Sequence, residues 1–350
     1  MKNSVINIEE FINKRDKCII IDVRSPSEFI KGHIPGAFNI PLFSDQERAI
    51  VGTKYVQENR FSSVLAGLKM VGPRLSSYIT QVKELSDSKN LLVYCWRGGM
   101  RSASMAWLFN LAGFNCEILE GGYRSYRRFV QSYFSIPFRL IVLGGMTGSG
   151  KTELLLNLSQ KGQQIIDLEG LANHKGSAFG AIGQKPQPST EHFENLLFET
   201  LFRLDAGHSI LVEDESKSIG SVFVPMAFYQ QMTQSPTIAI EVPFNVRLSR
   251  LKDEYTRCNP DLLIAAIEKI SKKLGPDSTK KCIQSVRDGD FTKAIEIVLI
   301  YYDKTYQYGL INKKYQPKII HIQEGDDSSN ISSRLIEEIT ALNLKTRDEN

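Results

Sequence analysis

Residues 140–152 read LIVLGGMTGSGKT, an apolar run that leads directly into a glycine-rich loop. Four consecutive apolar residues are typical of a strand buried in a parallel sheet. The loop fits the pattern G-x4-G-K-S/T, and the residues after it predict a helix over 151–160. In this order the three segments predict that backbone N–H groups surround a di- or triphosphate. The residues expected to bind it are Gly145, Thr147, Gly148, Ser149, Gly150, Lys151 and Thr152.

The phosphate loop has further candidate partners downstream. Lys151 is expected to neutralise phosphate oxygens, and the Thr152 hydroxyl could reach Mg²⁺. An apolar strand predicted over 209–214 ends in Glu213 and Asp214, where P-loop proteins place a Mg²⁺-binding acid. The pattern does not distinguish ATP or GTP from another diphosphate.

Three more polar residues follow the next predicted strand, near 164–168. They are Asp167, Glu169 and His174. Because ligands of parallel α/β sheets bind at the carboxyl ends of strands, we expect these side chains near the phosphate loop. For His174 a catalytic and a structural role are equally compatible with the sequence.

A second loop with chemical potential lies in residues 91–102, which read LLVYCWRGGMRS. Cys95 ends a predicted buried strand, and a helix is predicted to begin just after the glycines. Backbone N–H groups of such a loop bind anions and stabilise a thiolate. We interpret Cys95 as a nucleophile that attacks or carries a chalcogen atom, with Arg97 and Arg101 holding the anion.

Strands and helices alternate on both sides of residues 123–139, which predicts two α/β domains with parallel sheets and flanking helices. We place the domains at residues 1–135 and 136–350. Residues 45–90 are predicted to be mainly helical, with a break at Gly72-Pro73. The segment 123–139 is rich in arginine and aromatic residues. This composition is equally compatible with two interpretations. One is an RNA-binding segment in which Arg124, Arg127 and Arg128 contact phosphates, and the other is an amphipathic helix that docks on a core.

Composition excludes several classes of protein. The 350 residues are 42% hydrophobic and 23% charged, which argues against a disordered or fibrous chain. No apolar run approaches the roughly 20 residues of a membrane span, and no secretory signal is evident, so we expect a cytoplasmic protein without membrane partners. The five cysteines are scattered and form no CxxC pair, which argues against a zinc module. A net charge of +4 is too small to indicate nucleic-acid binding by itself, although the basic excess lies in residues 1–139.

The first part of the chain resembles the rhodanese family. The resemblance rests on the cysteine loop and on the segments IDVR at 21–24, GHIPGA at 32–37 and LEGG at 119–122. It implies a rhodanese-like sheet and a cysteine that carries sulfur as a persulfide. Two departures are visible: residues 45–90 form a longer insert, and the loop is one residue longer than usual. The resulting Cys-x5-Arg spacing is similar to that of dual-specificity phosphatases and would suit a phosphate-sized anion or selenium. For Asp22, Arg24, Glu28 and His33 we favour a structural role.

The pairing of both loops in one chain resembles the bacterial tRNA 2-selenouridine synthase family. The segments DLEGLANH at 167–174 and EDES at 213–216 add to it, whereas Lys175 stands where arginine is expected. The resemblance implies an enzyme with a P-loop NTPase-like second domain that modifies the wobble 2-thiouridine of tRNA. Its sulfur is first alkylated from geranyl diphosphate and is then replaced by selenium from selenophosphate. It implies tRNA as a partner and a possible enzyme that supplies selenophosphate, and it leaves the oligomeric state open.

Other functions remain compatible with the same motifs. One is a rhodanese-type sulfurtransferase or a Cys-x5-Arg phosphatase with a nucleotide-binding regulatory domain. Tyr94 stands where such phosphatases usually place histidine, which argues against the second. A nucleotide-switched tRNA-binding module would not need Cys95, and a small-molecule kinase would not need residues 1–135.

Overall fold

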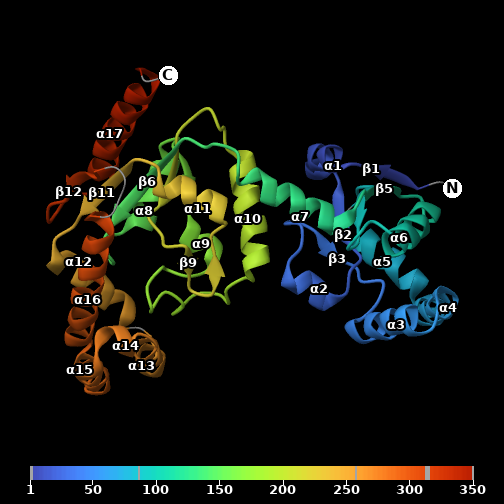
Figure 1. Cartoon of the computed structure of the whole chain (residues 1–350), viewed down its shortest axis with the longest axis horizontal. Helices are drawn as coiled ribbons and strands as arrows, with labels where there is room; N and C mark the ends of the chain where they lie inside the picture. The colour runs from blue at the N-terminus through green and yellow to red at the C-terminus, as the bar shows by residue number, and fades with distance from the viewer. Residues whose placement is uncertain (1–2, 86, 257, 312–315, 349–350) are drawn as a thin grey trace. The chain divides into compact units, whose positions relative to one another are not determined.

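The structure is a computed structural model that describes residues 3–85, 87–256, 258–311 and 316–348 (Figure 1). The chain divides into two compact units, Met1–Tyr133 and Phe134–Asn350. Each unit contains a five-stranded sheet whose paired strands are all parallel. The predicted fold class, two α/β domains with parallel sheets, is therefore confirmed.

The sheet of the first unit has the strand order β1-β5-β4-β2-β3. Its strands are β1 (Ser4–Ile6), β2 (Ile19–Asp22), β3 (Phe38–Asn39), β4 (Asn90–Tyr94) and β5 (Asn115–Leu119). The strand that leads into the cysteine loop, β4, lies in the middle of the sheet. Because parallel strands end at the same edge, the segments that follow β2, β4 and β5 lie along one edge of the sheet.

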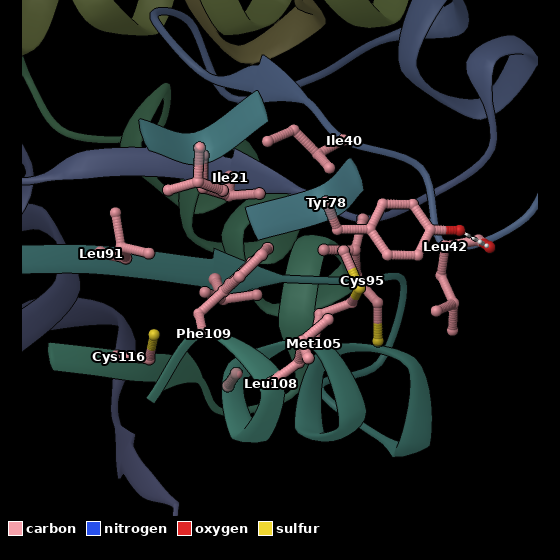
Figure 2. Packing of buried hydrophobic residues seen from close by; sticks show 14 of the residues in the cluster. Ile21, Ile40, Leu42, Tyr78, Leu91, Cys95, Met105, Leu108, Phe109 and Cys116 are labelled. Carbon is pink, nitrogen blue, oxygen red and sulfur yellow. Dashed lines mark hydrogen bonds between the residues drawn. The ribbon is translucent and has the colours of Figure 1, made fainter. Parts of the chain in front are cut away.

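The helices of the first unit are α1 (Ile8–Lys14), α2 (Pro26–Lys31), α3 (Asp45–Gln57), α4 (Arg60–Val71), α5 (Leu75–Leu85), α6 (Met100–Leu111) and α7 (Gly122–Tyr133). Short 3-10 helices span Arg15–Lys17 and Gly72–Arg74, the second at the predicted break of the helical insert. Figure 2 shows Cys95 within the hydrophobic core, which also contains Leu42, Tyr78 and Met105. The cysteine loop is thus anchored in the core of this unit.

Local signals set several of these boundaries. Helix α2 begins at Pro26 with Ser25 as its N-cap, and Gly113 follows the end of α6 with a φ of 89°, both as predicted. Strands β1 and β3 were not predicted, because two or three residues are too few to show a periodic pattern. The arginine- and aromatic-rich segment is helical over Gly122–Tyr133, and Tyr123 and Tyr126 are fully buried.

The sheet of the second unit has the strand order β12-β11-β6-β8-β7. Its strands are β6 (Leu140–Gly145), β7 (Gln164–Ile166), β8 (Ile210–Glu213), β11 (Thr237–Glu241) and β12 (Lys318–His321), and a separate antiparallel pair is formed by β9 (Ser218–Ile219) and β10 (Val222–Phe223). The phosphate-loop strand β6 lies between β11 and β8. The acids that end β8 therefore lie next to the phosphate loop.

The helices of the second unit are α8 (Lys151–Gln160), α9 (Leu168–Ala172), α10 (Thr190–Arg203), α11 (Met226–Thr233), α12 (Phe244–Tyr255), α13 (Pro260–Lys269), α14 (Ser271–Leu274), α15 (Pro276–Arg287), α16 (Phe291–Ile311) and α17 (Ser328–Asp348). The predicted helical region 261–308 corresponds to α13 to α16. In the part of the chain that the structure describes, no helix combines the length and the apolar character needed to cross a membrane.

Candidate functional site

The cysteine loop holds its thiol buried at the end of β4. Cys95 is 2% exposed, and its Sγ lies 3.3 Å from the Oγ of Ser102, a fully buried residue in the first turns of α6. The Ser102 hydroxyl also donates a hydrogen bond to the Gly99 carbonyl at 3.0 Å. Since one hydroxyl has one proton, the contact with Sγ uses the proton of the thiol. When the thiol ionises, Ser102 can turn its proton to the sulfur.

The loop around Cys95 offers unpaired backbone donors. Among the described residues, none accepts a hydrogen bond from the N–H groups of Trp96, Arg97, Gly98 or Gly99. Gly98 has a φ of 67°, which turns the backbone of the loop, and α6 begins two residues later. Free N–H groups beside a helix N-terminus form a cradle for an anion. Anion binding by this loop stays a prediction, and the unpaired N–H groups are the donors that it would use.

The turn after β5, which contains Gly122, packs against the backbone of the cysteine loop. The N–H of Tyr123 donates to the Cys95 carbonyl at 2.8 Å, and the N–H of Arg124 donates to the Trp96 carbonyl at 3.1 Å. A Cβ on Gly122 would lie 2.2 Å from the Cys95 carbonyl oxygen. Only glycine therefore allows this close approach of the two backbones.

Replacing Gly122 by alanine is expected to lower the free energy of unfolding by at least about 2 kcal/mol more than Gly113→Ala. Both glycines have positive φ, so both variants carry the same kind of backbone strain, but a Cβ on Gly113 meets no atom within 4 Å. Urea unfolding of the full chain measures the difference. Equal unfolding midpoints for the two variants would contradict the close packing of the glycine turn against the loop.

The two arginines of the loop differ in their surroundings. Arg101 donates a hydrogen bond to the Glu28 carboxylate at 2.7 Å, and Arg48 Nε lies 3.2 Å from the same oxygen. Burial of Glu28 opposes its ionisation, but the hydrogen bond and charge of Arg101 lower the pKa of Glu28 to about 2. Arg97 is exposed. Arg101 is thus held in place, whereas Arg97 is free to meet a ligand from solvent.

The Glu28–Arg101 pair should make the free energy of unfolding depend on pH. The pKa of Glu28 is lower in the folded chain than in the unfolded chain, where it is about 4.3, so ionised Glu28 stabilises the fold above that pH. We expect Glu28→Gln to cost about 1–2 kcal/mol at neutral pH and the cost to vanish as pH falls from about 5 to about 2. Urea unfolding at several pH values measures it, with the exposed Glu58→Gln as control. A cost that stays constant with pH would contradict the ion pair.

The other polar residues of the first unit have structural surroundings. Arg24 forms a bidentate, fully buried ion pair with Asp22, with Nη2 to Oδ2 at 2.6 Å, and also donates to the Gly32 carbonyl at 2.7 Å. Its guanidinium lies 3.9 Å from the centroid of the Tyr123 ring. The ring of His33 stacks on a phenylalanine ring of α2. His33 is half-buried, and this burial lowers its pKa. These contacts fix the loop after β2.

The phosphate loop of the second unit has the conformation that its glycines predict. Gly148 and Gly150 have φ of 79° and 81°, and α8 begins at Lys151. The Lys151 Nζ donates to the Gly145 carbonyl at 3.1 Å, so the side chain folds back over the loop. The Ser149 hydroxyl is buried, and no described residue forms a hydrogen bond with it. The loop therefore has a lysine and an unsatisfied polar group at the position expected for a phosphate.

Two acids from separate segments meet at Thr152. Its Oγ1 lies 2.9 Å from Glu213 Oε1 and 3.1 Å from Glu169 Oε2. Burial and the charges of Glu169 and Asp167 raise the pKa of Glu213 to about 8. Burial and Glu169 also raise the pKa of Glu215 well above its usual range. Burial and the neighbouring negative charges therefore favour the protonated forms of Glu213 and Glu215.

The remaining predicted residues of this unit have different surroundings. Asp167 is the N-cap of α9 and accepts from the Gly170 N–H at 2.7 Å. Asp214 lies on the wall of a cavity beside the loop. His174 is 7% exposed, burial lowers its pKa, and its ring packs against Gly180 and Gly220. The structure thus brings Glu169 and Glu213 to Thr152, whereas Asp167 and His174 have local structural contacts. Lys175, the departure from the family pattern, pairs with Glu254.

Several residues at the phosphate loop were missed by the sequence analysis. Arg250 on α12 donates to the Gly148 carbonyl at 2.9 Å and keeps an exposed guanidinium beside the loop. Arg247 donates to the Thr147 carbonyl at 3.1 Å and forms a bidentate pair with Asp303. No local pattern distinguishes these arginines, because their partners are more than 50 residues away. Glu215 was part of the predicted acidic strand end but was not selected.

A cavity of about 460 Å³ adjoins the phosphate loop. It is bordered by Gly145 and Thr147 on one side and by aromatic and aliphatic side chains of α11 and α16 on the other, among them Tyr229, Met232, Tyr302, Tyr306 and Leu310. Tyr302 and Tyr306 of α16 thus lie on the cavity wall, which gives the phosphate site an aromatic neighbour.

The arginines of α7 lie on the surface of that helix. Arg124 and Arg128 are exposed and Arg127 is half-buried, whereas the aromatic residues Tyr123 and Tyr126 are buried. The aromatic residues dock on the core, as expected for an amphipathic helix, and Arg124 and Arg128 face solvent. Binding of RNA phosphates by the arginines of this helix stays a prediction.

Comparisons with known proteins agree with both halves of the chain. Residues 138–333 match the family model described as the tRNA 2-selenouridine synthase AAA domain, and residues 7–128 match the rhodanese-like domain. A protein of Hydrogenovibrio crunogenus named tRNA 2-selenouridine synthase is 36% identical over 335 residues, covering 84% of this chain and 90% of its own length. One of Nitrosomonas europaea with the same name is 31% identical over 351 residues, covering 85% and 90%. This chain therefore belongs to the tRNA 2-selenouridine synthase family.

Proposed function

We propose that this chain replaces the sulfur of 2-thiouridine in tRNA by selenium, through an S-geranylated nucleoside. The observation that carries the proposal is the presence of two different anion sites in one chain. The phosphate loop adjoins a cavity with one aromatic and aliphatic wall, which suits a prenyl diphosphate. The cysteine loop combines a buried thiol with unpaired N–H groups, which suits a small anion that the thiol attacks.

In the first step the phosphate loop binds geranyl diphosphate. The loop N–H groups and Lys151 hold the diphosphate, Arg250 can add a second cation, and the isoprenoid chain enters the adjoining cavity beside Tyr306. The thiocarbonyl sulfur of the nucleoside attacks C1 of the geranyl group. A carbon–sulfur bond forms, the carbon–oxygen bond breaks, and its electron pair leaves on pyrophosphate, while the N3 proton of the nucleoside passes to water. Lys151 stabilises the charge that develops there.

Magnesium fits the oxygen donors at this site. Thr152, Glu169 and Glu213 present hard oxygen atoms, which Mg²⁺ prefers. In the part of the chain described, no three His, Cys, Asp or Glu side chains form a metal site by themselves. Thr152 and Glu213 would therefore hold Mg²⁺ together with the diphosphate, where the cation would neutralise the leaving group.

In the second step we place selenophosphate in the cysteine loop. The Cys95 thiolate attacks phosphorus, a sulfur–phosphorus bond forms, and the phosphorus–selenium pair leaves as hydrogen selenide. The selenide attacks C2 of the nucleoside, and the C2–sulfur pair leaves as geranyl thiol. Water then hydrolyses the phosphocysteine. Selenium keeps one oxidation level throughout, whereas a cysteine perselenide would require either that phosphorus leaves as phosphite or that a separate two-electron oxidant takes part. The Cys-x5-Arg spacing, with Arg97 and Arg101 on the phosphoryl oxygens, supports this route.

The tRNA would contact the surface around the cysteine loop. Arg124 and Arg128 are exposed on α7, whose first turn is hydrogen-bonded to the loop. Trp96 in the loop is 37% exposed and could stack on a nucleobase. Arg127, half-buried on the same helix, would add charge near the RNA backbone.

Nucleoside mass spectrometry of 2-thiouridine-containing tRNA tests the function. We expect an S-geranyl nucleoside with the full chain and geranyl diphosphate, and 2-selenouridine when selenophosphate is also present. A tRNA that stays unchanged in both reactions would contradict the function, and phosphatase and thiosulfate sulfurtransferase assays would then test the alternatives for Cys95.

A further inference from the structure

A second apolar cavity lies in the first unit, formed by the helical insert. Its volume is about 190 Å³, and its walls come from α3, α4, the segment before them and the start of α6. The lining is almost entirely apolar and includes Leu42, Phe43, Val51, Val64, Leu68 and Met100. Gly67 keeps α4 close to this wall, because a Cβ there would lie 3.2 Å from the Phe43 ring.

This cavity adjoins the start of α6, the helix that follows the cysteine loop. Leu42 and Phe43 belong to the same hydrophobic cluster as Cys95, and Figure 2 shows Leu42 near Cys95. Met100 and Arg101, the first residues of α6, line the cavity and directly follow the loop. A ligand whose reacting atom lies at the loop could therefore extend an apolar substituent past Arg101 into the cavity.

The size and chemistry of the cavity limit its occupant. Phosphate, ribose and nucleobases need several polar partners. The walls are mainly apolar, and their polar residues are Arg60, Ser63, Arg101 and Ser104. The volume is below the roughly 300 Å³ at which sites for drug-sized ligands begin. A slender hydrocarbon chain meets both conditions. The insert also presents exposed apolar side chains outside the cavity, including Phe61 and Leu65, so its surface is apolar beyond the cavity itself.

We propose that this cavity binds the geranyl chain of S-geranyl-2-thiouridine during the selenium step. The inference rests on the proposed function and adds a substrate-binding role for the α3–α4 insert. Binding of the chain would place C2 of the nucleoside at the cysteine loop, where the C2–selenium bond forms. The C2–sulfur bond breaks, and geranyl thiol leaves with the electron pair and a proton from water. The phosphate-loop cavity serves the donor, and this one serves the leaving group.

The test uses short anticodon stem-loop RNAs that carry chemically prepared S-geranyl- or S-methyl-2-thiouridine, so the first step is bypassed. With the full chain and selenophosphate we expect kcat/KM for the S-geranyl RNA to exceed that for the S-methyl RNA by at least about 100-fold. Burial of a few methylene groups of the geranyl chain is enough to produce such a factor. In Leu68→Asp, a charge at the cavity wall should reduce this ratio at least about tenfold. Leu65→Asp is the matched control, an exposed leucine of the same helix outside the cavity.

The outcomes separate this inference from the proposed function. If the wild-type chain selenates both RNAs equally well, or if Leu68→Asp keeps the full preference, the cavity does not bind the chain. If the wild-type chain selenates neither RNA, the proposed function itself fails. Circular dichroism of both variants, with S-geranylation of 2-thiouridine RNA as a second activity, shows that Leu68→Asp remains folded.

Discussion

Cys95→Ser is expected to abolish selenation while S-geranylation continues, so that the S-geranyl nucleoside accumulates. Serine lacks a nucleophile that ionises near neutral pH, and loss of an essential nucleophile typically lowers the rate by 10³-fold or more. The phosphate loop lies in the other compact unit and does not need this thiol. Nucleoside mass spectrometry after reaction with both co-substrates measures the two products separately.

The same substitution at Cys18 provides the control, since this half-buried thiol lies before β2 and outside the cysteine loop. Cys18→Ser should give normal amounts of 2-selenouridine. Intact-mass spectrometry of acid-quenched wild-type chain with selenophosphate should also detect one phosphoryl group on Cys95. Normal selenation by Cys95→Ser would contradict the assignment of this residue.

Lys151→Ala is expected to lower the rate of S-geranylation by about 10² to 10³-fold, because it removes the cation that stabilises the leaving pyrophosphate. Selenation of RNA that already carries S-geranyl-2-thiouridine should persist, since that step uses the cysteine loop. Cys95→Ser would then lose selenation and keep S-geranylation, whereas Lys151→Ala would lose S-geranylation and keep selenation. Rate measurements with the two RNA substrates give both values from one preparation.

Lys185→Ala is a suitable control, because Lys185 is exposed in the loop before α10. It should leave both rates near those of the wild-type chain. Loss of both activities in Lys151→Ala, with the chain still folded, would show that the two steps do not use separate sites.

The motifs that predicted the fold are local, which explains why they could be recognised in the sequence. A buried strand, a glycine-rich loop and a helix follow one another within residues 140–160 and again within 91–111, and short-range backbone geometry fixes both. Strand β4 and strand β6 are continuous apolar runs because both faces of a parallel sheet are covered. Cys95, Lys151 and Thr152 could therefore be placed at loop positions from sequence alone.

Contacts between distant segments account for what the sequence did not predict. Glu28 holds Arg101 across 73 residues, and Arg250 meets the phosphate loop across 102 residues. Neither pair has a sequence pattern, since a charged residue on a helix resembles any solvated one. The cavity of the α3–α4 insert was missed for the same reason. Its apolar residues look like ordinary core positions until the tertiary structure leaves space between them.

A single-turnover time course tests most directly the claim that selenium enters through a geranylated nucleoside. Excess full chain is mixed with 2-thiouridine tRNA, geranyl diphosphate and selenophosphate, and nucleosides are quantified at successive times. We predict that the S-geranyl nucleoside rises first and then decays as 2-selenouridine appears, and that omission of geranyl diphosphate prevents both. Formation of 2-selenouridine at the full rate without geranyl diphosphate would contradict the account.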